Sequence, residues 1–287
     1  MAPNPNEANQ TLADPTEPLP LSKPSPQSKT PQWRELLVTP TQSPPTSIVT
    51  ASHSTVAKAQ PDFQLSLAKA STPPSLLLPT LSERYKSLLA TPGSVIEISP
   101  ESQSYAAEFA RRIGGSHPKS SATPKRYINN QATPLPVSKP RPSGAALILD
   151  YGPASTIPTS TLRGIRAHKP VSPLTSPGLI DISADVDFTA LAESALEASP
   201  GVEVHGPVEQ GAWLETMGIR QRGEILCERL DKDGGGNAEE AKMRIKGAIE
   251  RLVERHGGAM GKIYKVLAIV PERGGRRPVG FGGSLSE

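Results

Sequence analysis

The chain has 287 residues, of which 32 are proline, 36% are hydrophobic and only 4% are aromatic. This is too little apolar material for a core along the whole length, because proline- and serine-rich segments cannot bury enough surface to offset the chain entropy. The net charge of +3 comes from mixed signs and gives no reason to expect a nucleic-acid partner. The single cysteine excludes an internal disulfide framework and a multi-cysteine zinc site.

The composition also argues against targeting and membrane segments. No apolar run approaches the roughly eighteen residues that span a bilayer, so we expect no membrane span. The proline-rich start has no basic residue before Lys23, so no secretory signal or transit peptide is visible.

Shifts in composition predict five segments. They are a disordered proline-rich lead (1–30), an ordered part with strands and a helix (31–115) that contains an internal loop (40–61), a low-complexity insertion (116–143), a second ordered part (144–271) and a flexible tail (272–287).

The first ordered part begins with strand-like runs. Pro31–Val38 and the alternating Phe63–Leu67 are expected to be strands, and Val95–Ile98 a further short strand. A helix should follow, because Ser99 is suited to cap it and Pro100 to occupy its first position. Tyr105, Phe109 and Ile113 would share one face of this helix, which Gly114-Gly115 should end.

The second ordered part opens with GAALILDYG, residues 144–152. Its unbroken apolar run suits a parallel strand covered on both faces, although a buried helix segment has the same pattern. Asp150 and Tyr151 then lie at the carboxyl end of the strand, where ligands bind in open α/β sheets. This end is therefore the first place to look for a site.

The remaining elements follow from caps and periodicity. Helices are expected at Thr189–Ala198 (with Asp187 as a possible cap), Gln210–Met217, 223–230 and Ala238–Arg255, and strands at Val202–Val204 and Ile263–Val270.

Three acids close together form the most suggestive cluster. Asp181, Asp185 and Asp187 could position a cationic substrate or hold a metal, yet aspartate also caps helices and turns. The Asp231–Lys242 stretch superficially resembles a calcium loop, but its twelfth position is lysine instead of glutamate. A flexible helix connector explains that stretch better, and we predict no metal site.

Several blocks in fixed order carry a resemblance to a known family. GAALILDYG, TLRGIRAH, DISADVDFTAL and GPVEQGAWLETMGI, with PQWRELLV and SVIEISPESQSYAAEFARRI upstream, resemble segments of the MidA-like family. That family comprises the mitochondrial complex I assembly-factor methyltransferases and their bacterial relatives. The resemblance extends over roughly residues 31–271, interrupted by the low-complexity insertions.

The resemblance implies a class I, Rossmann-like α/β methyltransferase fold with S-adenosylmethionine as cofactor. It implies a protein substrate, a complex I subunit whose arginine is methylated in mitochondria. For the acceptor guanidinium we expect Asp150, Asp181 and Asp185 to supply charge, and Tyr151 and His168 to shape the pocket or carry a proton. The alternative is that these residues are satisfied structural polar groups.

One departure from the family pattern concerns the donor. The family's glycine-rich cofactor loop and ribose-binding acid lie upstream of the blocks quoted above, and this chain shows no counterpart of either. We therefore expect an incomplete methyltransferase fold without cofactor-binding residues, which binds no S-adenosylmethionine by itself. The alternative function is a non-catalytic interaction or assembly protein derived from the half-domain.

Overall fold

The computed structural model describes residues 31–41, 61–116 and 139–282, except residues 235 and 257. The expected disordered lead and most of the two expected loops lie outside the described residues.

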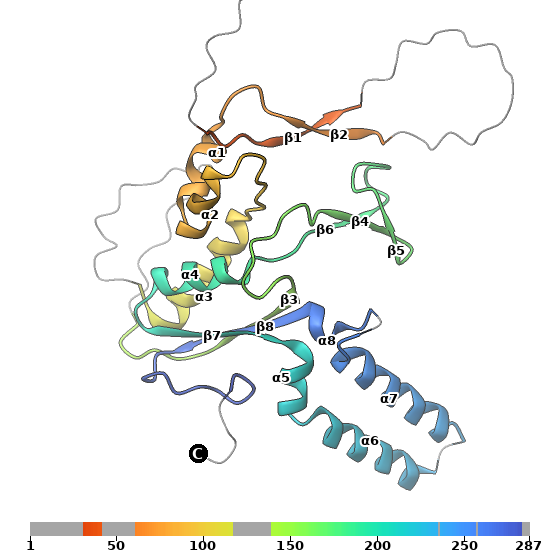
Figure 1. Cartoon of the computed structure of the whole chain (residues 1–287). Helices are drawn as coiled ribbons and strands as arrows, with labels where there is room; N and C mark the ends of the chain where they lie inside the picture. The colour runs from red at the N-terminus through yellow and green to blue at the C-terminus, as the bar shows by residue number, and fades with distance from the viewer. Residues whose placement is uncertain (1–30, 42–60, 117–138, 235, 257, 283–287) are drawn as a thin grey trace, which may run out of the picture.

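The described residues form strands and helices in mixed order (Figure 1). The strands are β1 (Leu36–Pro40), β2 (Phe63–Leu67), β3 (Ala146–Tyr151), β4 (Arg163–Arg166), β5 (Lys169–Val171), β6 (Asp181–Ser183), β7 (Val202–Glu209) and β8 (Tyr264–Pro271). The helices are α1 (Pro73–Leu77), α2 (Glu83–Ser87), α3 (Pro100–Gly114), α4 (Phe188–Ala198), α5 (Gln210–Thr216), α6 (Ile219–Asp233), α7 (Ala238–Val253) and α8 (Met260–Ile263), with short 3-10 turns at Leu78–Thr80 and Leu88–Ala90.

A three-stranded sheet in the order β3-β8-β7 forms the centre of the fold. Both outer strands pair antiparallel with β8 and therefore run parallel to each other. Helices α3 and α4 pack against one face of this sheet (Figure 1). The main core between these layers consists of Ala106, Ala110, Ile113, Phe188, Leu191, Ala195, Val202, Leu267 and Ile269.

The expectation for β3 was wrong in two respects. This strand pairs antiparallel with β8, and it lies at the edge of the sheet, not between covering layers. Ala146 and Ile148 pack against the core, but Leu147 and Leu149 on the opposite face are 47% and 44% exposed. The apolar run alone could not reveal this, because successive strand residues alternate between faces that tertiary packing covers separately.

Local helix signals were read correctly. The Ser99 hydroxyl accepts a hydrogen bond from the Ser102 amide at the start of α3, and Gly115 caps its end. The Asp187 carboxylate likewise accepts from the Ala190 amide at the start of α4. These caps satisfy backbone amides that have no partner within the helix.

One expectation about the first ordered part was wrong, that of a strand at residues 95–98, and the helix face shared by Tyr105, Phe109 and Ile113 is only partly buried. Tyr105 is 68% exposed and Phe109 is 42% exposed, because α3 turns the alanines Ala106 and Ala110 toward α4 instead. Small side chains allow the two helices to approach closely. Residues 95–98 form no strand and pass through the structure as irregular backbone.

Smaller elements surround the central layers. β1 and β2 form an antiparallel hairpin, and β5-β4-β6 form a second three-stranded sheet. α6 and α7 form a helical hairpin that projects from the body beyond α5 (Figure 1). No helix within the described ranges is both long enough and apolar enough to cross a membrane.

The described part of the expected flexible tail packs back onto the sheet. Phe281 is buried beside Val266 and Ala268 on the face opposite α3 and α4. The Glu203 carboxylate accepts hydrogen bonds from the amides of Gly275 and Arg273, which hold its pKa below the usual range. The tail up to Gly282 therefore contacts the sheet in the folded chain.

The packing of α3 depends on a glycine pair. A Cβ on Gly201 would lie 2.3 Å from the Gly114 carbonyl oxygen and 2.9 Å from its Cα. Because both atoms belong to the backbone, we expect Gly201→Ala to lower the free energy of unfolding by about 1–3 kcal/mol. The matched control is Gly247→Ala in α7, where nothing lies within 4 Å. This control should be neutral or stabilising by up to about 1 kcal/mol. Urea unfolding followed by circular dichroism measures both, and equal midpoints would contradict the prediction.

Candidate functional site

The segment between β6 and α4 crosses the carboxyl end of β3. A Cβ on Gly152 would lie 2.3 Å from the Val186 carbonyl oxygen, so glycine is required for this close approach. The Val186 amide donates a hydrogen bond to the Tyr151 carbonyl oxygen at 3.0 Å. These contacts place Asp185 and Asp187, which flank Val186 in the chain, beside the end of β3.

An arginine side chain is held between Tyr151 and Asp185. The guanidinium carbon of Arg163 lies 4.6 Å from the centroid of the Tyr151 ring, and its Nη1 donates to Asp185 Oδ1 at 2.7 Å. The ring of Tyr264 meets Tyr151 edge-on at 5.5 Å between centroids. Burial opposes the positive charge, but the hydrogen bond and charge of Asp185 outweigh it and raise the pKa of Arg163. The site is thus suited to binding a guanidinium group.

Glu97 joins this site although no sequence pattern assigned it a role. Its carboxylate accepts hydrogen bonds from the Thr161 amide at 2.7 Å, the Leu162 amide at 3.2 Å and the Thr161 hydroxyl. The Thr161 hydroxyl oxygen in turn accepts from the Asp185 amide at 2.9 Å. The only sequence signal for Glu97 was a lone acid within the apolar VIEI run. The sequence pattern suggested a strand over residues 95–98 and therefore gave Glu97 no role in a site.

Asp187 has a structural task. Besides capping α4, it accepts from Arg84 Nη1 at 2.9 Å and from the Tyr85 hydroxyl at 2.8 Å. Burial and the negative charge of Asp187 raise the pKa of Tyr85, so this phenol stays protonated and donates. The network connects α2 to α4 in the folded chain.

A cavity of about 390 Å³ lies next to these residues. It is bounded by residues 97–103, by Leu162 and by residues 184–187 with the first turn of α4. Glu97, Asp185 and Asp187 are the charged side chains of its lining. Asp185 and Asp187 are paired with Arg163 and Arg84, so Glu97 is the carboxylate that leaves the wall negative, which favours a cationic ligand over an anionic one.

The structure separates the residues singled out in the sequence. Tyr151 and Asp185 come together around Arg163. Asp150 precedes Tyr151 on β3, so its side chain lies on the other face of the strand, and its carboxylate accepts from the Tyr151 amide at 2.8 Å. His168 lies exposed in the turn between β4 and β5, at the end of the hairpin remote from Arg163. Asp181 is exposed on β6, opposite Ile165.

The three acids of the sequence cluster therefore do not form a metal site. Asp185 pairs with Arg163, Asp187 pairs with Arg84, and Asp181 is exposed at the surface. Within the described ranges, no group of three or more histidine, cysteine, aspartate or glutamate side chains is placed to hold a metal ion.

Comparison with known proteins assigns the chain to a family. Residues 19–208, more than half of the 287-residue chain, match the family described as "Putative S-adenosyl-L-methionine-dependent methyltransferase". The chain belongs to this methyltransferase family. The resemblance seen in the sequence is thereby confirmed at the level of the family, with a mixed α/β structure to accompany it.

Curated relatives carry a more specific name. The chain is 38% identical to "Protein arginine methyltransferase NDUFAF7, mitochondrial" of Mus musculus over 130 residues, which is 45% of this chain and 27% of the relative. Identity to the Rattus norvegicus protein of that name is 44%, again over 45% of this chain and 27% of the relative. Identity to the Drosophila melanogaster homologue is 37%, over 46% of this chain and 28% of the relative. The chain thus spans about a quarter of the length of the relatives it matches.

The donor of this methyltransferase family can be compared with the residues present. Among the described residues, no strand leads through a glycine-rich turn into a helix that could hold the donor's adenosine and carboxylate. Within the described ranges, the donor's glycine turn is therefore without a counterpart.

We expect Asp187→Ala to destabilise the chain by about 2–4 kcal/mol, because it removes a helix cap and leaves Arg84 and Tyr85 without their shared acceptor. Asp187→Asn should lose less, since the amide oxygen can still cap α4. Asp181→Ala is the control at an exposed position and should stay within about 0.5 kcal/mol of the parent. Thermal unfolding of the three variants provides the comparison, and equal losses for Asp187→Ala and Asp181→Ala would contradict the structural role.

Proposed function

We propose that this chain supplies the acceptor side of a protein arginine methyltransferase, the side that holds the substrate guanidinium during methyl transfer. Membership of the methyltransferase family and the names of the relatives support this reaction class. The structural feature that supports it is the Tyr151–Asp185 pair, which already holds one guanidinium, that of Arg163, against an aromatic face and a carboxylate.

Asp185 is the residue we expect to contact the substrate. Arg163 donates to its Oδ1, while Oδ2 accepts no hydrogen bond from the described residues. Asp185 also lines the cavity, so a guanidinium entering there can donate to the free oxygen. Glu97 differs, because both of its carboxylate oxygens already accept from Thr161 and Leu162. Glu97 would add negative charge and hold Thr161 in place.

The chemistry requires the acceptor nitrogen to be held in one orientation. S-adenosylmethionine, the donor named in the family description, supplies the methyl group when it is bound. Asp185 would fix the plane of the guanidinium and limit its rotation, which contributes through positioning. The nitrogen that gains a carbon must lose a proton, and Asp185 Oδ2 is the carboxylate oxygen that we propose accepts it.

The other candidate residues receive different roles in this proposal. Asp150 would act as a second carboxylate at the end of β3, directed by the amide of Tyr151. His168 and Asp181 would not touch the acceptor, because each lies exposed on the sheet formed by β4, β5 and β6. The relatives are named mitochondrial, and we propose the same compartment for this chain, with an arginine of a complex I subunit as the substrate suggested by the resemblance.

The acceptor role predicts selective binding of guanidinium compounds. Titration of the full chain with N-acetyl-arginine methylamide should give saturable binding, and Asp185→Asn should weaken it by about tenfold or more. N-acetyl-lysine methylamide is the ligand control, since its ammonium cannot form the planar paired contact. Asp181→Asn is the variant control and should bind like the parent. Equal binding by the Asp185→Asn and Asp181→Asn variants would contradict the assignment.

The donor side yields a separate prediction. We expect calorimetric titration of the full chain with S-adenosylmethionine to show no tight binding, because the described residues supply no glycine turn for it. Tight binding would contradict this prediction without affecting the acceptor site. Transfer of labelled methyl groups to an arginine peptide by the chain alone would contradict it as well.

A non-catalytic interaction protein remains the second candidate function. The helical hairpin favours this alternative, because α6 and α7 keep large apolar side chains such as Ile225 and Met243 exposed at 51% and 65%. Absence of guanidinium binding would favour this candidate over the first.

A further inference from the structure

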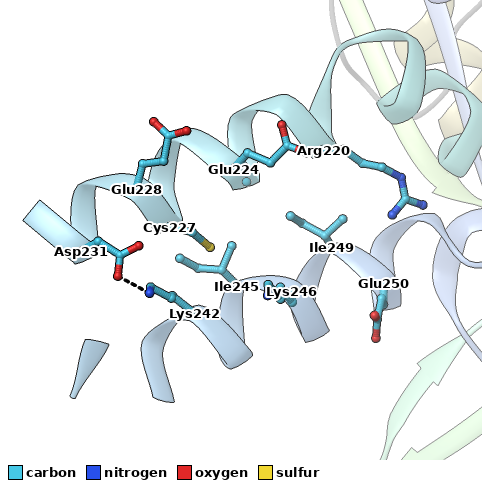
Figure 2. A pocket seen from close by; sticks show the side chains of 11 residues that line it. Arg220, Glu224, Cys227, Glu228, Asp231, Lys242, Ile245, Lys246, Ile249 and Glu250 are labelled. Atoms are coloured by element: carbon cyan, nitrogen blue, oxygen red, sulfur yellow. Dashed lines mark hydrogen bonds and ion pairs between the residues drawn. The ribbon is translucent and has the colours of Figure 1, made fainter. Parts of the chain in front are cut away.

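The α6–α7 hairpin carries a groove along its length (Figure 2). Its volume is about 540 Å³, and its floor is formed by Gly223 and Cys227 of α6 with Ile245 and Ile249 of α7. The helices approach each other closely at Gly223, where a Cβ would lie 2.3 Å from Ile249 Cδ1. The groove therefore has an apolar base that the two helices do not close.

Few side chains of the α6–α7 hairpin are buried between its two helices. Among the described residues, α6 has one buried residue, Gly223, and α7 has one, Val253. Ile245 and Ile249 remain half-buried in the groove. Because two helices of this length gain most of their stability from tertiary packing, a further layer over the groove would add apolar burial that the single chain lacks.

The two rims of the groove carry opposite charges. Along most of its length the α6 rim is acidic, with Glu224, Glu228 and Asp231, and the α7 rim is basic, with Lys242 and Lys246 (Figure 2). Near the body the signs are reversed, with Arg220 on α6 and Glu250 on α7.

Contacts at the tip and base of the hairpin align the two rims. At the tip, Lys242 pairs with Asp231 within the chain. At the other end, Gly223 lies level with Ile249. Glu228 and Lys246 therefore lie at similar levels between these contacts, yet neither takes part in an ion pair within the described residues. These two charges remain available to a partner.

We propose that the groove is covered by the same groove of a second copy of this chain, related by a two-fold axis parallel to the hairpin. Such an axis places α6 of each copy over α7 of the other, so the two floors meet. Glu228 then faces the partner's Lys246, and Arg220 faces the partner's Glu250. Glu228 and Arg220 thus each meet a charge of opposite sign on the partner, although Arg220 also pairs with Glu215 within its own chain.

The other two-fold arrangement is less favourable. An axis perpendicular to the helices would place α6 over the partner's α6 and α7 over the partner's α7. Lys246 would then lie against the partner's Lys246, and the acids of the α6 rim would face each other. Like charges placed opposite one another cost free energy, so the charge pattern favours the parallel axis.

Charge-reversal variants test this arrangement directly. Light scattering coupled to size exclusion should give the full chain the mass of two copies. Glu228→Lys alone and Lys246→Glu alone should each weaken the dimer roughly tenfold or more, since both symmetry-related contacts become repulsive. Mixing the two variants should restore the dimer, because each of the two symmetry-related contacts then again pairs one lysine with one glutamate. An ion pair formed within one chain cannot be restored by mixing. Restoration of the dimer would therefore show that Glu228 and Lys246 pair between two copies.

The control reverses a charge outside the groove. Lys232→Glu lies on the exposed surface of α6, is absent from the groove lining, and should leave the mass unchanged. Circular dichroism checks that the variants keep their helices. A monomeric parent chain would overturn the proposal, as would single variants that remain dimeric or a mixture of folded variants that stays monomeric.

The native cysteine gives a second measurement that needs no charge variant. Cys227 is the single cysteine of the chain and lines the groove, so a second copy should shield its thiol. Its rate of reaction with a thiol reagent should fall as the concentration of the chain rises through the range of dimerisation. A rate independent of concentration, in a chain shown to be dimeric, would place the dimer interface elsewhere and overturn the proposal.

Discussion

The contact between Val186 and Gly152 determines where the chemistry-bearing residues lie. It lets the segment before α4 cross the end of β3 at backbone distance, which no residue with a side chain would permit. Asp185 and Asp187 are next to Val186 in the chain, so this one crossing directs one acid to Arg163 and the other to Arg84 and Tyr85. The acceptor site and the attachment of α2 therefore depend on the same backbone contact.

The sequence predicted best those features that depend on a few adjacent residues. The caps at Ser99 and Asp187 and the alternating strand Phe63–Leu67 are present as expected, since each needs only local backbone geometry and the period of the side chains. The family resemblance also came from the sequence, through ordered blocks. The position of Asp150 and Tyr151 at the end of a strand was likewise correct.

Features that depend on pairing between distant segments could not be predicted in this way. The direction of β3 is set by β8, more than one hundred residues later. Its second face is exposed because no element within the described ranges covers Leu147 and Leu149. Glu97 received no role, because its partners Thr161 and Leu162 lie far along the chain. In the same way, Asp181 and Asp185 are four residues apart but differ in surroundings, since the first is exposed on β6 while Arg163 binds the second.

The acceptor site and the groove are physically separate parts of one chain. The first lies at the end of β3 against α3 and α4, and the second lies on a hairpin that contacts the sheet mainly through α5 and α8. A charge reversed on the groove rim is therefore not expected to disturb the Tyr151–Asp185 pair. Association would nevertheless matter for the acceptor, because the apolar burial gained at the groove would stabilise α6 and α7. Those helices support α5, which continues directly from β7. Dimerisation through the α6–α7 groove would thus stabilise the sheet that positions Tyr151, although the interface contributes no group to the site.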